Sequence, residues 1–164
     1  MVNIDKGGPP LTPEARANLI ARVKNLLLSP KTEWERIDAE PATVQGLYVG
    51  YVCILAAIPA LATLLRYAMS GLVVTGVVSA IVTYVVWLGS VAVVAVIAEA
   101  LAPQFRRTLS RIDAFKLAAY SATPAMLAGV FMLNWMLAPL TIIGLYGIFL
   151  FYLGWQQLAK PRLA

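Results

Sequence analysis

Long uncharged apolar stretches dominate the chain. Residues 44–102 contain only two charged side chains, Arg66 and Glu99, and residues 117–159 contain none. Uncharged apolar runs longer than about 18 residues are typical of membrane-spanning helices, because such a helix crosses the hydrocarbon core of a bilayer. The pattern therefore predicts an all-α protein, a polytopic transmembrane bundle of about four spans.

The boundaries of the spans follow from charges, prolines and loop signals. We expect the spans at 44–66, 70–102, 115–133 and 139–158. The second stretch is about 50 Å long as one helix, which exceeds the hydrocarbon thickness. It favours one long, tilted helix, with a tight re-entrant pair as the alternative. Pro59 is expected to kink the helix of the first span, and Pro124 to break that of the third.

The N-terminal region precedes the first span. Residues 1–12 are expected to be disordered, and Thr12-Pro13-Glu14 has the residues of a helix start. Within 13–43 we expect two short helices with apolar side chains on one face. Two placements stay open: amphipathic helices in the membrane interface, with Trp34 as a headgroup-level anchor, or helices packed on the cytoplasmic face of the bundle. Docking of a partner on these helices is compatible with both.

Composition excludes several classes of protein. Hydrophobic residues make up 60% of the chain and charged residues 13%, which fits neither a small soluble domain nor a disordered chain. The absence of histidine excludes imidazole chemistry, and the single cysteine, Cys53, cannot form an intramolecular disulfide. No phosphate loop, nucleophile elbow or acidic metal cluster is present. We therefore expect no enzyme and no cofactor.

The acidic residues outside the apolar stretches alternate with basic ones. This alternation predicts a solvated surface for Asp5, Glu14, Glu33, Glu35, Asp38 and Glu40.

The basic residues are distributed asymmetrically. The N-terminal region holds six Lys and Arg, the 104–116 loop four and the tail at 159–164 two, against Arg66 alone on the opposite side. This excess predicts that both termini are cytoplasmic. The expected partner is the lipid bilayer, and binding of anionic lipid by Arg106, Arg107 and Arg111 stays open. A nucleic-acid role is not expected, because no basic face interleaved with aromatic residues exists.

Glu99 is the one carboxylate near the bilayer. It is either a proton or cation site, or a structural residue paired with Arg106 or Arg107. Small residues also recur at four-residue spacing in the spans, and Gly147 and Gly154 share one face of the last span. They pack the monomer internally or pair it with a second copy or another membrane protein.

Three segments resemble one known family. They are LSPKTEW at 28–34, AYSATP at 119–124 and LYGIFLFYLG at 145–154. The chain is similar over about residues 26–160 to the Ypt-interacting-protein (YIP) membrane-domain family, in its bacterial form. The motif residues are Trp34, Tyr120, Pro124, Tyr146 and Gly154.

The resemblance implies an all-helical multi-pass protein, here of the bacterial inner membrane. Eukaryotic members contact small GTPases of the Rab type and associate with one another. Their aspartate-leucine-tyrosine-glycine-proline motif is missing here, so GTPase binding does not carry over. Members usually have five spans, and whether a fifth follows Lys160-Pro161 stays open.

Tyr120 and Pro124 are linked by helix geometry. Proline has no backbone N–H, so the carbonyl of Tyr120 loses its helical donor, and Ser121 or Thr123 are expected to help satisfy the freed groups. We interpret the motif as a structural signature. The expected function is a non-enzymatic membrane scaffold or interaction protein of the YIP type. The alternative is a small transporter or channel component that uses Glu99 and proline-broken helices.

Overall fold

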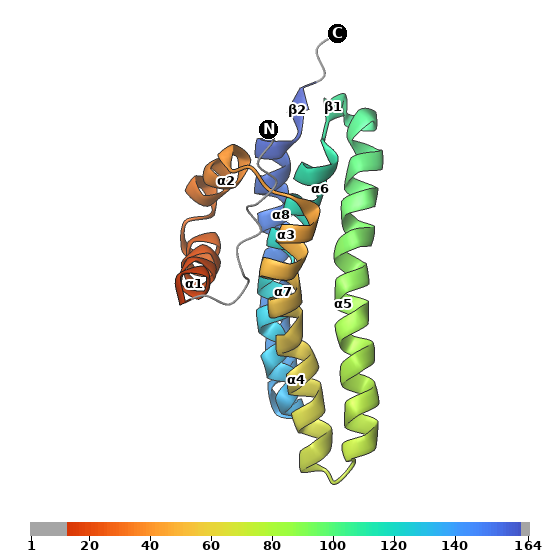
Figure 1. The fold of residues 1–164 in the computed structure, drawn as a ribbon. Helices are drawn as coiled ribbons and strands as arrows, with labels where there is room; N and C mark the ends of the chain where they lie inside the picture. The colour runs from red at the N-terminus through yellow and green to blue at the C-terminus, as the bar shows by residue number, and fades with distance from the viewer. Residues whose placement is uncertain (1–12, 162–164) are drawn as a thin grey trace, which may run out of the picture.

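The computed structural model describes residues 13–161, and the expected disorder of residues 1–12 lies outside the described part. The described chain is almost entirely helical (Figure 1). Its elements are α1 (Pro13–Leu28), α2 (Pro30–Ala39), α3 (Val44–Leu47), η1 (Tyr48–Val52), α4 (Cys53–Met69), α5 (Val73–Leu101), η2 (Ala102–Phe105), β1 (Arg107–Thr108), α6 (Arg111–Ser121), α7 (Thr123–Ala128), η3 (Gly129–Leu133), η4 (Trp135–Leu145), α8 (Tyr146–Leu158) and β2 (Lys160–Pro161).

Four helices of the described chain are long and apolar enough to cross a membrane, judged by length and composition. They are Val44–Met69, Val73–Phe105, Arg111–Leu133 and Trp135–Leu158. They run side by side as an elongated bundle (Figure 1). The expected all-α bundle with four spans is confirmed.

The second span is one continuous helix, α5, of 29 residues. It follows a tight turn at Ser70–Leu72, where Gly71 takes a left-handed backbone with φ of 76° that glycine adopts without steric cost. The turn explains why the helix begins at Val73 and not at residue 70. The long helix, and not the re-entrant pair, is the arrangement found.

The two prolines act differently. The helix α4 continues through Pro59, whereas the third span breaks between α6 and α7, and Pro124 lies in the first turn of α7. The helix α4 and the segment η3 of the third span are in contact at Pro59, since a Cβ on Gly129 would lie 2.5 Å from the Cβ of Pro59. Only glycine fits so close an approach, so the first and third spans pack backbone against ring.

The third and fourth spans both start earlier than expected. Ser110 caps α6 by accepting a hydrogen bond from the Asp113 N–H at 3.2 Å, so the helix starts at Arg111 and not at 115. Lys116 therefore lies in a helix and not in a loop. The fourth span starts at Trp135 as a 3-10 helix that contains Pro139, and becomes α-helical at Tyr146.

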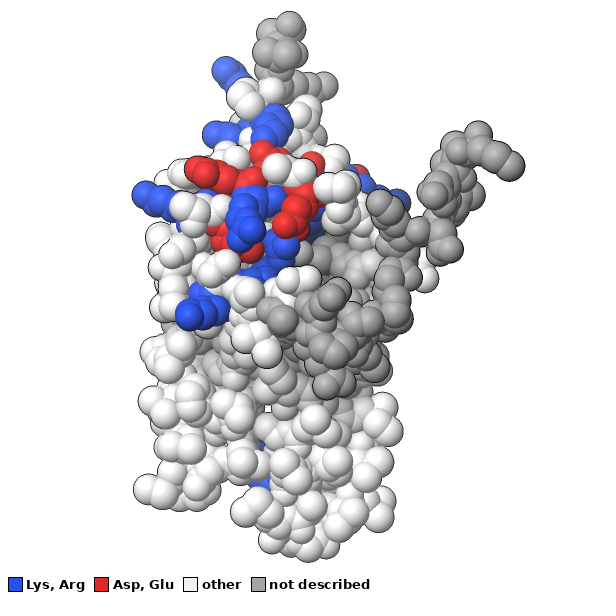
Figure 2. Space-filling view, turned by 60° about the vertical axis from the view of Figure 1, so that its left-hand side comes forward, with Lys and Arg blue, Asp and Glu red and all other residues white. Residues whose placement is uncertain are grey.

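Charged groups gather at one end of the bundle. There α1 and α2 lie beside the ends of α6 and α8, and the strands β1 and β2 pair antiparallel, with Thr108 opposite Lys160 (Figure 1). Figure 2 shows the Lys, Arg, Asp and Glu side chains concentrated at this end, while most of the remaining surface in view is uncharged. The 104–116 segment and the C-terminal residues thus form one charged cap with the N-terminal helices.

Candidate functional site

The side chain of Trp34 lies inside the bundle. It is 1% exposed, and its indole meets the Tyr120 ring edge-on with ring centroids 6.2 Å apart. Gly154 of α8 makes room for it, because a Cβ on that glycine would lie 2.6 Å from Trp34 Cζ2. Trp34 is therefore not a headgroup-level anchor. The indole is buried among aromatic neighbours instead, and its Nε1 has no hydrogen-bond partner among the described residues.

Tyr120 joins α2 to the first span. Its ring packs edge-on against Tyr51 at a centroid distance of 4.7 Å, and the Tyr51 hydroxyl shares a 2.7 Å hydrogen bond with Thr123 Oγ1. Tyr51 lies in η1, a π-helical turn that changes the direction of side chains along the helix. Thr123 thus bonds to a tyrosine rather than to the freed backbone, and the buried Ser121 Oγ has no hydrogen-bond partner among the described residues. The expectation that these hydroxyls satisfy the backbone at the Pro124 break is not met.

An ionic group covers the aromatic cluster. The Arg22 guanidinium lies over the Tyr120 ring, 5.5 Å from its centroid, and pairs with Glu40 at 2.5 Å and with Glu33 at 3.4 Å. Burial alone would lower the pKa of Arg22, but the hydrogen bond to Glu40 and the negative charges of Glu40 and Glu33 outweigh burial and raise it. Arg22 therefore stays cationic and joins α1 to α2.

Glu33 is only 3% exposed. The expectation of a solvated surface is wrong for this residue, because a guanidinium from the neighbouring helix α1 compensates its charge.

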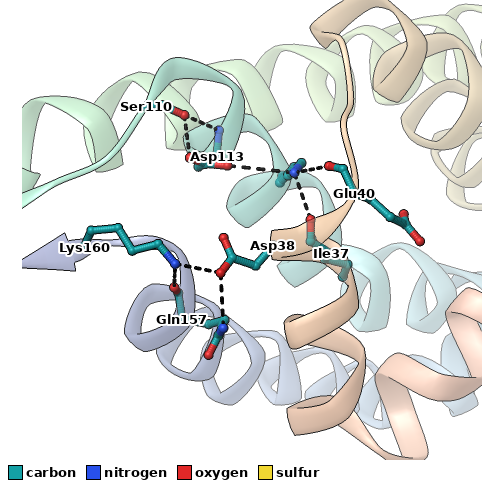
Figure 3. Close-up of polar contacts among 8 residues, drawn as sticks. Ile37, Asp38, Glu40, Ser110, Asp113, Gln157 and Lys160 are labelled. Atoms are coloured by element: carbon teal, nitrogen blue, oxygen red, sulfur yellow. Dashed lines mark hydrogen bonds and ion pairs between the residues drawn. The ribbon is translucent and has the colours of Figure 1, made fainter.

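Lys116 holds the C-terminal end of α2. Its side chain is buried, and Nζ donates hydrogen bonds to the carbonyls of Ile37 at 2.8 Å and Glu40 at 2.7 Å (Figure 3). Asp113 lies 3.9 Å from the same ammonium. The last carbonyls of a helix lack intrahelical donors and carry partial negative charge, so a cation there both satisfies and stabilises them.

Two further contacts attach the N-terminal helices to the last span. Asp38 accepts hydrogen bonds from Lys160 at 2.6 Å and from Gln157 at 3.2 Å (Figure 3). The hydroxyl of Tyr146 donates to the Leu27 carbonyl in the last turn of α1 at 3.3 Å. Both helices are thus attached to α8 through polar groups as well as through Trp34.

The three arginines of the basic segment have different environments. Arg107 Nη1 donates to the Ala159 carbonyl at 2.6 Å and joins the 104–116 segment to the C-terminal residues. Arg106 is exposed and has a left-handed backbone with φ of 56°, and Arg111 is exposed in the first turn of α6. Arg106 and Arg111 are therefore accessible to a ligand, and Arg107 serves the fold.

Glu99 is half-buried near the end of α5. None of the ion pairs among the side chains that the structure describes includes it, so the expected pair with Arg106 or Arg107 is not among them.

Sequence reasoning missed four residues of this cluster: Arg22, Tyr51, Glu33 and Lys116. One signal was available for Lys116, since it directly precedes the uncharged stretch 117–159. No local pattern marks Arg22 and Glu33, because they meet only after α1 and α2 fold against each other.

The motif residues share this location. Trp34, Tyr120 and Gly154 touch within one cluster, Pro124 ends the helix that carries Tyr120, and Tyr146 binds α1. No curated protein and no solved structure matches the chain. A family model, the Yip1 domain, matches residues 24–162. Because this match includes α2 and all four spans, the chain belongs to the Yip1 domain family.

Proposed function

We propose that this membrane protein of the Yip1 domain family is a non-enzymatic scaffold or interaction protein of the bacterial inner membrane. The proposal rests on the position of the motif residues, which lie where α2 packs against the bundle. Trp34, Tyr120 and Gly154 all contribute to attaching α2, and Tyr120 also lines a cavity between α1 and the first span together with Arg22 and Tyr51. The side chains that are most characteristic of the family are thus used to hold α2, with its exposed outer face, on the bundle.

The surface that would meet a partner is the outer face of α2. Lys31, Glu35 and Arg36 are exposed there, and Arg106 and Arg111 are exposed at the same end of the bundle. A mixed-charge face on a helix held in place suits a protein partner, because charges at an interface set specificity and orientation. Because α2 is already held in place, less conformational entropy is lost when a partner binds to it.

The orientation of this surface follows from charge. The end with α2 carries nearly all Lys and Arg, so it belongs on the cytoplasmic side, and the turn at Ser70 on the opposite side. The single cysteine makes the test direct: in a Cys53→Ser background, Lys31→Cys and Ser70→Cys are labelled with a membrane-impermeant maleimide. Label on Ser70→Cys in intact cells, and on Lys31→Cys only after permeabilisation, is expected. The reverse pattern would contradict the orientation.

The transporter alternative depends on Glu99. A coupling carboxylate needs a polar cavity, and the intramembrane cavity between α4 and α5 is lined by other residues. The interaction role is therefore the better supported of the two.

The interaction role is tested by exchanging two charges on α2. The pair Lys31→Glu and Glu35→Lys keeps the net charge and the spacing of one helical turn, and neither residue forms a described ion pair. Tagged wild type and exchange variant are purified from native membranes in mild detergent and compared by mass spectrometry and native mass. Ser70→Asn, at the other end of the bundle, is the control.

We expect a stoichiometric partner with the wild type and the control, and its loss with the exchange variant at unchanged thermal stability. A single chain or a homo-oligomer that is the same in all three preparations would contradict the proposal.

A further inference from the structure

Two cavities meet at the end of the bundle opposite to α2. One, of about 640 Å³, lies between α4, α5 and the 3-10 segments η3 and η4. The other, of about 760 Å³, lies at the turn between α4 and α5 beside Asn134 and Trp135. Arg66 and Tyr67 line both cavities. The two cavities therefore adjoin at the side chains of Arg66 and Tyr67.

Arg66 is the only charged residue between positions 41 and 98. Its guanidinium stacks over the Tyr67 ring, 4.8 Å from the centroid, and it has no carboxylate partner among the described residues. A guanidinium held against an aromatic face keeps its donors in a plane suited to a phosphate or carboxylate. Its position in the last turn of α4 corresponds to the headgroup level of a bilayer.

The polarity of the cavity decreases with depth. Ser79, Thr83 and Trp87 line it along α5, at about 9, 15 and 21 Å from the start of that helix at 1.5 Å per residue. The cavity beyond Arg66 is mainly apolar, and its other hydroxyl groups are partly satisfied, since Thr63 donates to the Pro59 carbonyl at 2.8 Å. Going into the cavity, the guanidinium comes first, then the hydroxyl groups, then the apolar part. A phospholipid has its phosphate, its glycerol esters and its acyl chains in the same order.

We propose that these cavities bind one glycerophospholipid of the leaflet opposite to α2. Arg66 binds the phosphodiester, Ser79 and Thr83 face the glycerol ester region, and one acyl chain lies in the 640 Å³ cavity against Trp87. Charge complementarity selects this ligand: the site offers a positive charge without a protein counter-ion, next to an apolar space of the size that small-molecule sites have. The site is separate from the α2 surface and does not depend on the proposed function.

The test is native mass spectrometry of the full chain in mild detergent with added phosphatidylglycerol or diacylglycerol, which lacks the phosphate. Arg66→Gln removes the charge, and Arg66→Lys retains it. Ser79→Trp fills the cavity below the charge, and Lys31→Gln is the matched loss of an exposed charge at the other end of the bundle. Glycerophosphate serves as a competitor without acyl chains.

We expect the wild type, Arg66→Lys and Lys31→Gln to retain phosphatidylglycerol at least about tenfold better than diacylglycerol, as a charge-assisted hydrogen bond provides. Arg66→Gln should remove this preference, and Ser79→Trp should lower retention of both lipids. Equal retention of phosphatidylglycerol by the wild type and Arg66→Gln would overturn the proposal, as would equal binding of both lipids by the wild type. Complete competition by glycerophosphate would overturn it too, because it would indicate a site for free phosphate.

Discussion

The indole of Trp34 packs directly against the backbone of Gly154. The indole of Trp34 fills the position where a side chain of residue 154 would begin, and a Cβ there would lie 2.6 Å from Cζ2. Residue 154 is in the last span and residue 34 in an N-terminal helix, so this contact is one of those that join the two ends of the described chain. It links the tryptophan of one family motif to the glycine of another.

Substitution of Gly154 should release α2. Gly154→Ala is expected to destabilise the fold by about 1–3 kcal/mol, because the added methyl group collides with Trp34 and Leu117 in a packed core. The midpoint of thermal unfolding in mild detergent measures the effect.

Gly89→Ala is the matched control, since nothing lies within 4 Å of a Cβ at that position of α5. It should leave the midpoint unchanged or raise it slightly, because alanine favours the helix. An equal loss of stability in both variants would show that the loss comes from replacing glycine in a helix and not from a collision with the Trp34 indole.

Loss of Lys116 should loosen the end of α2. Lys116→Met keeps the length of the side chain but leaves the carbonyls of Ile37 and Glu40 without its donors, at a cost of about 1–3 kcal/mol. Trypsin cleavage at Lys31 and Arg36 requires local opening of the helix, so cleavage should become about tenfold faster.

Lys160→Met serves as the comparison for that experiment. Its exposed pair with Asp38 should contribute less than about 1 kcal/mol, so cleavage should change little. Equal cleavage of wild type and Lys116→Met would contradict the role of the buried lysine.

The buried ion pair between Arg22 and Glu33 predicts that substitutions of its two partners have non-additive effects on stability. Arg22→Met should destabilise by about 2–4 kcal/mol, because the buried Glu33 then keeps only the exposed Arg36, at 3.7 Å, as a counter-charge. The double variant Arg22→Met with Glu33→Gln should be more stable than Arg22→Met alone. A double-mutant cycle on unfolding midpoints measures the coupling. Simple addition of the two effects would mean that the ion pair does not stabilise the attachment of α1 to α2.

The hydroxyl pair between Tyr51 and Thr123 predicts a smaller effect. Tyr51→Phe and Thr123→Val should each cost about 1 kcal/mol, the range of hydrogen bonds between transmembrane helices. Both together should cost little more than either alone, because each removes the same bond. Additive losses in thermal unfolding would show that the two hydroxyls act independently.

Much of the membrane part could be predicted from the sequence. Uncharged runs determine where a helix can cross a bilayer, and they predicted four spans and one long second helix. Pro124 broke the third span as expected, since the lack of an N–H acts locally. The start of that span was missed because it depends on the single cap at Ser110.

The site could be predicted only in part. The motif resemblance identified Trp34, Tyr120 and Gly154, but no sequence spacing indicates that residues 34, 120 and 154 touch. Glu33 was placed at the surface because charges that alternate in sequence are usually solvated. Its burial depends on Arg22 from another helix, which is a tertiary property.

The central claim is that the family motif fixes α2 on the bundle, and amide hydrogen exchange in lipid nanodiscs tests it most directly. Wild type is compared with Trp34→Ala, and with Trp135→Ala as a control, because Trp135 is 78% exposed. We predict that Trp34→Ala speeds exchange throughout Pro30–Ala39 while α4 and α5 stay protected, and that Trp135→Ala changes neither region. Unchanged exchange of Pro30–Ala39 in Trp34→Ala would contradict the claim.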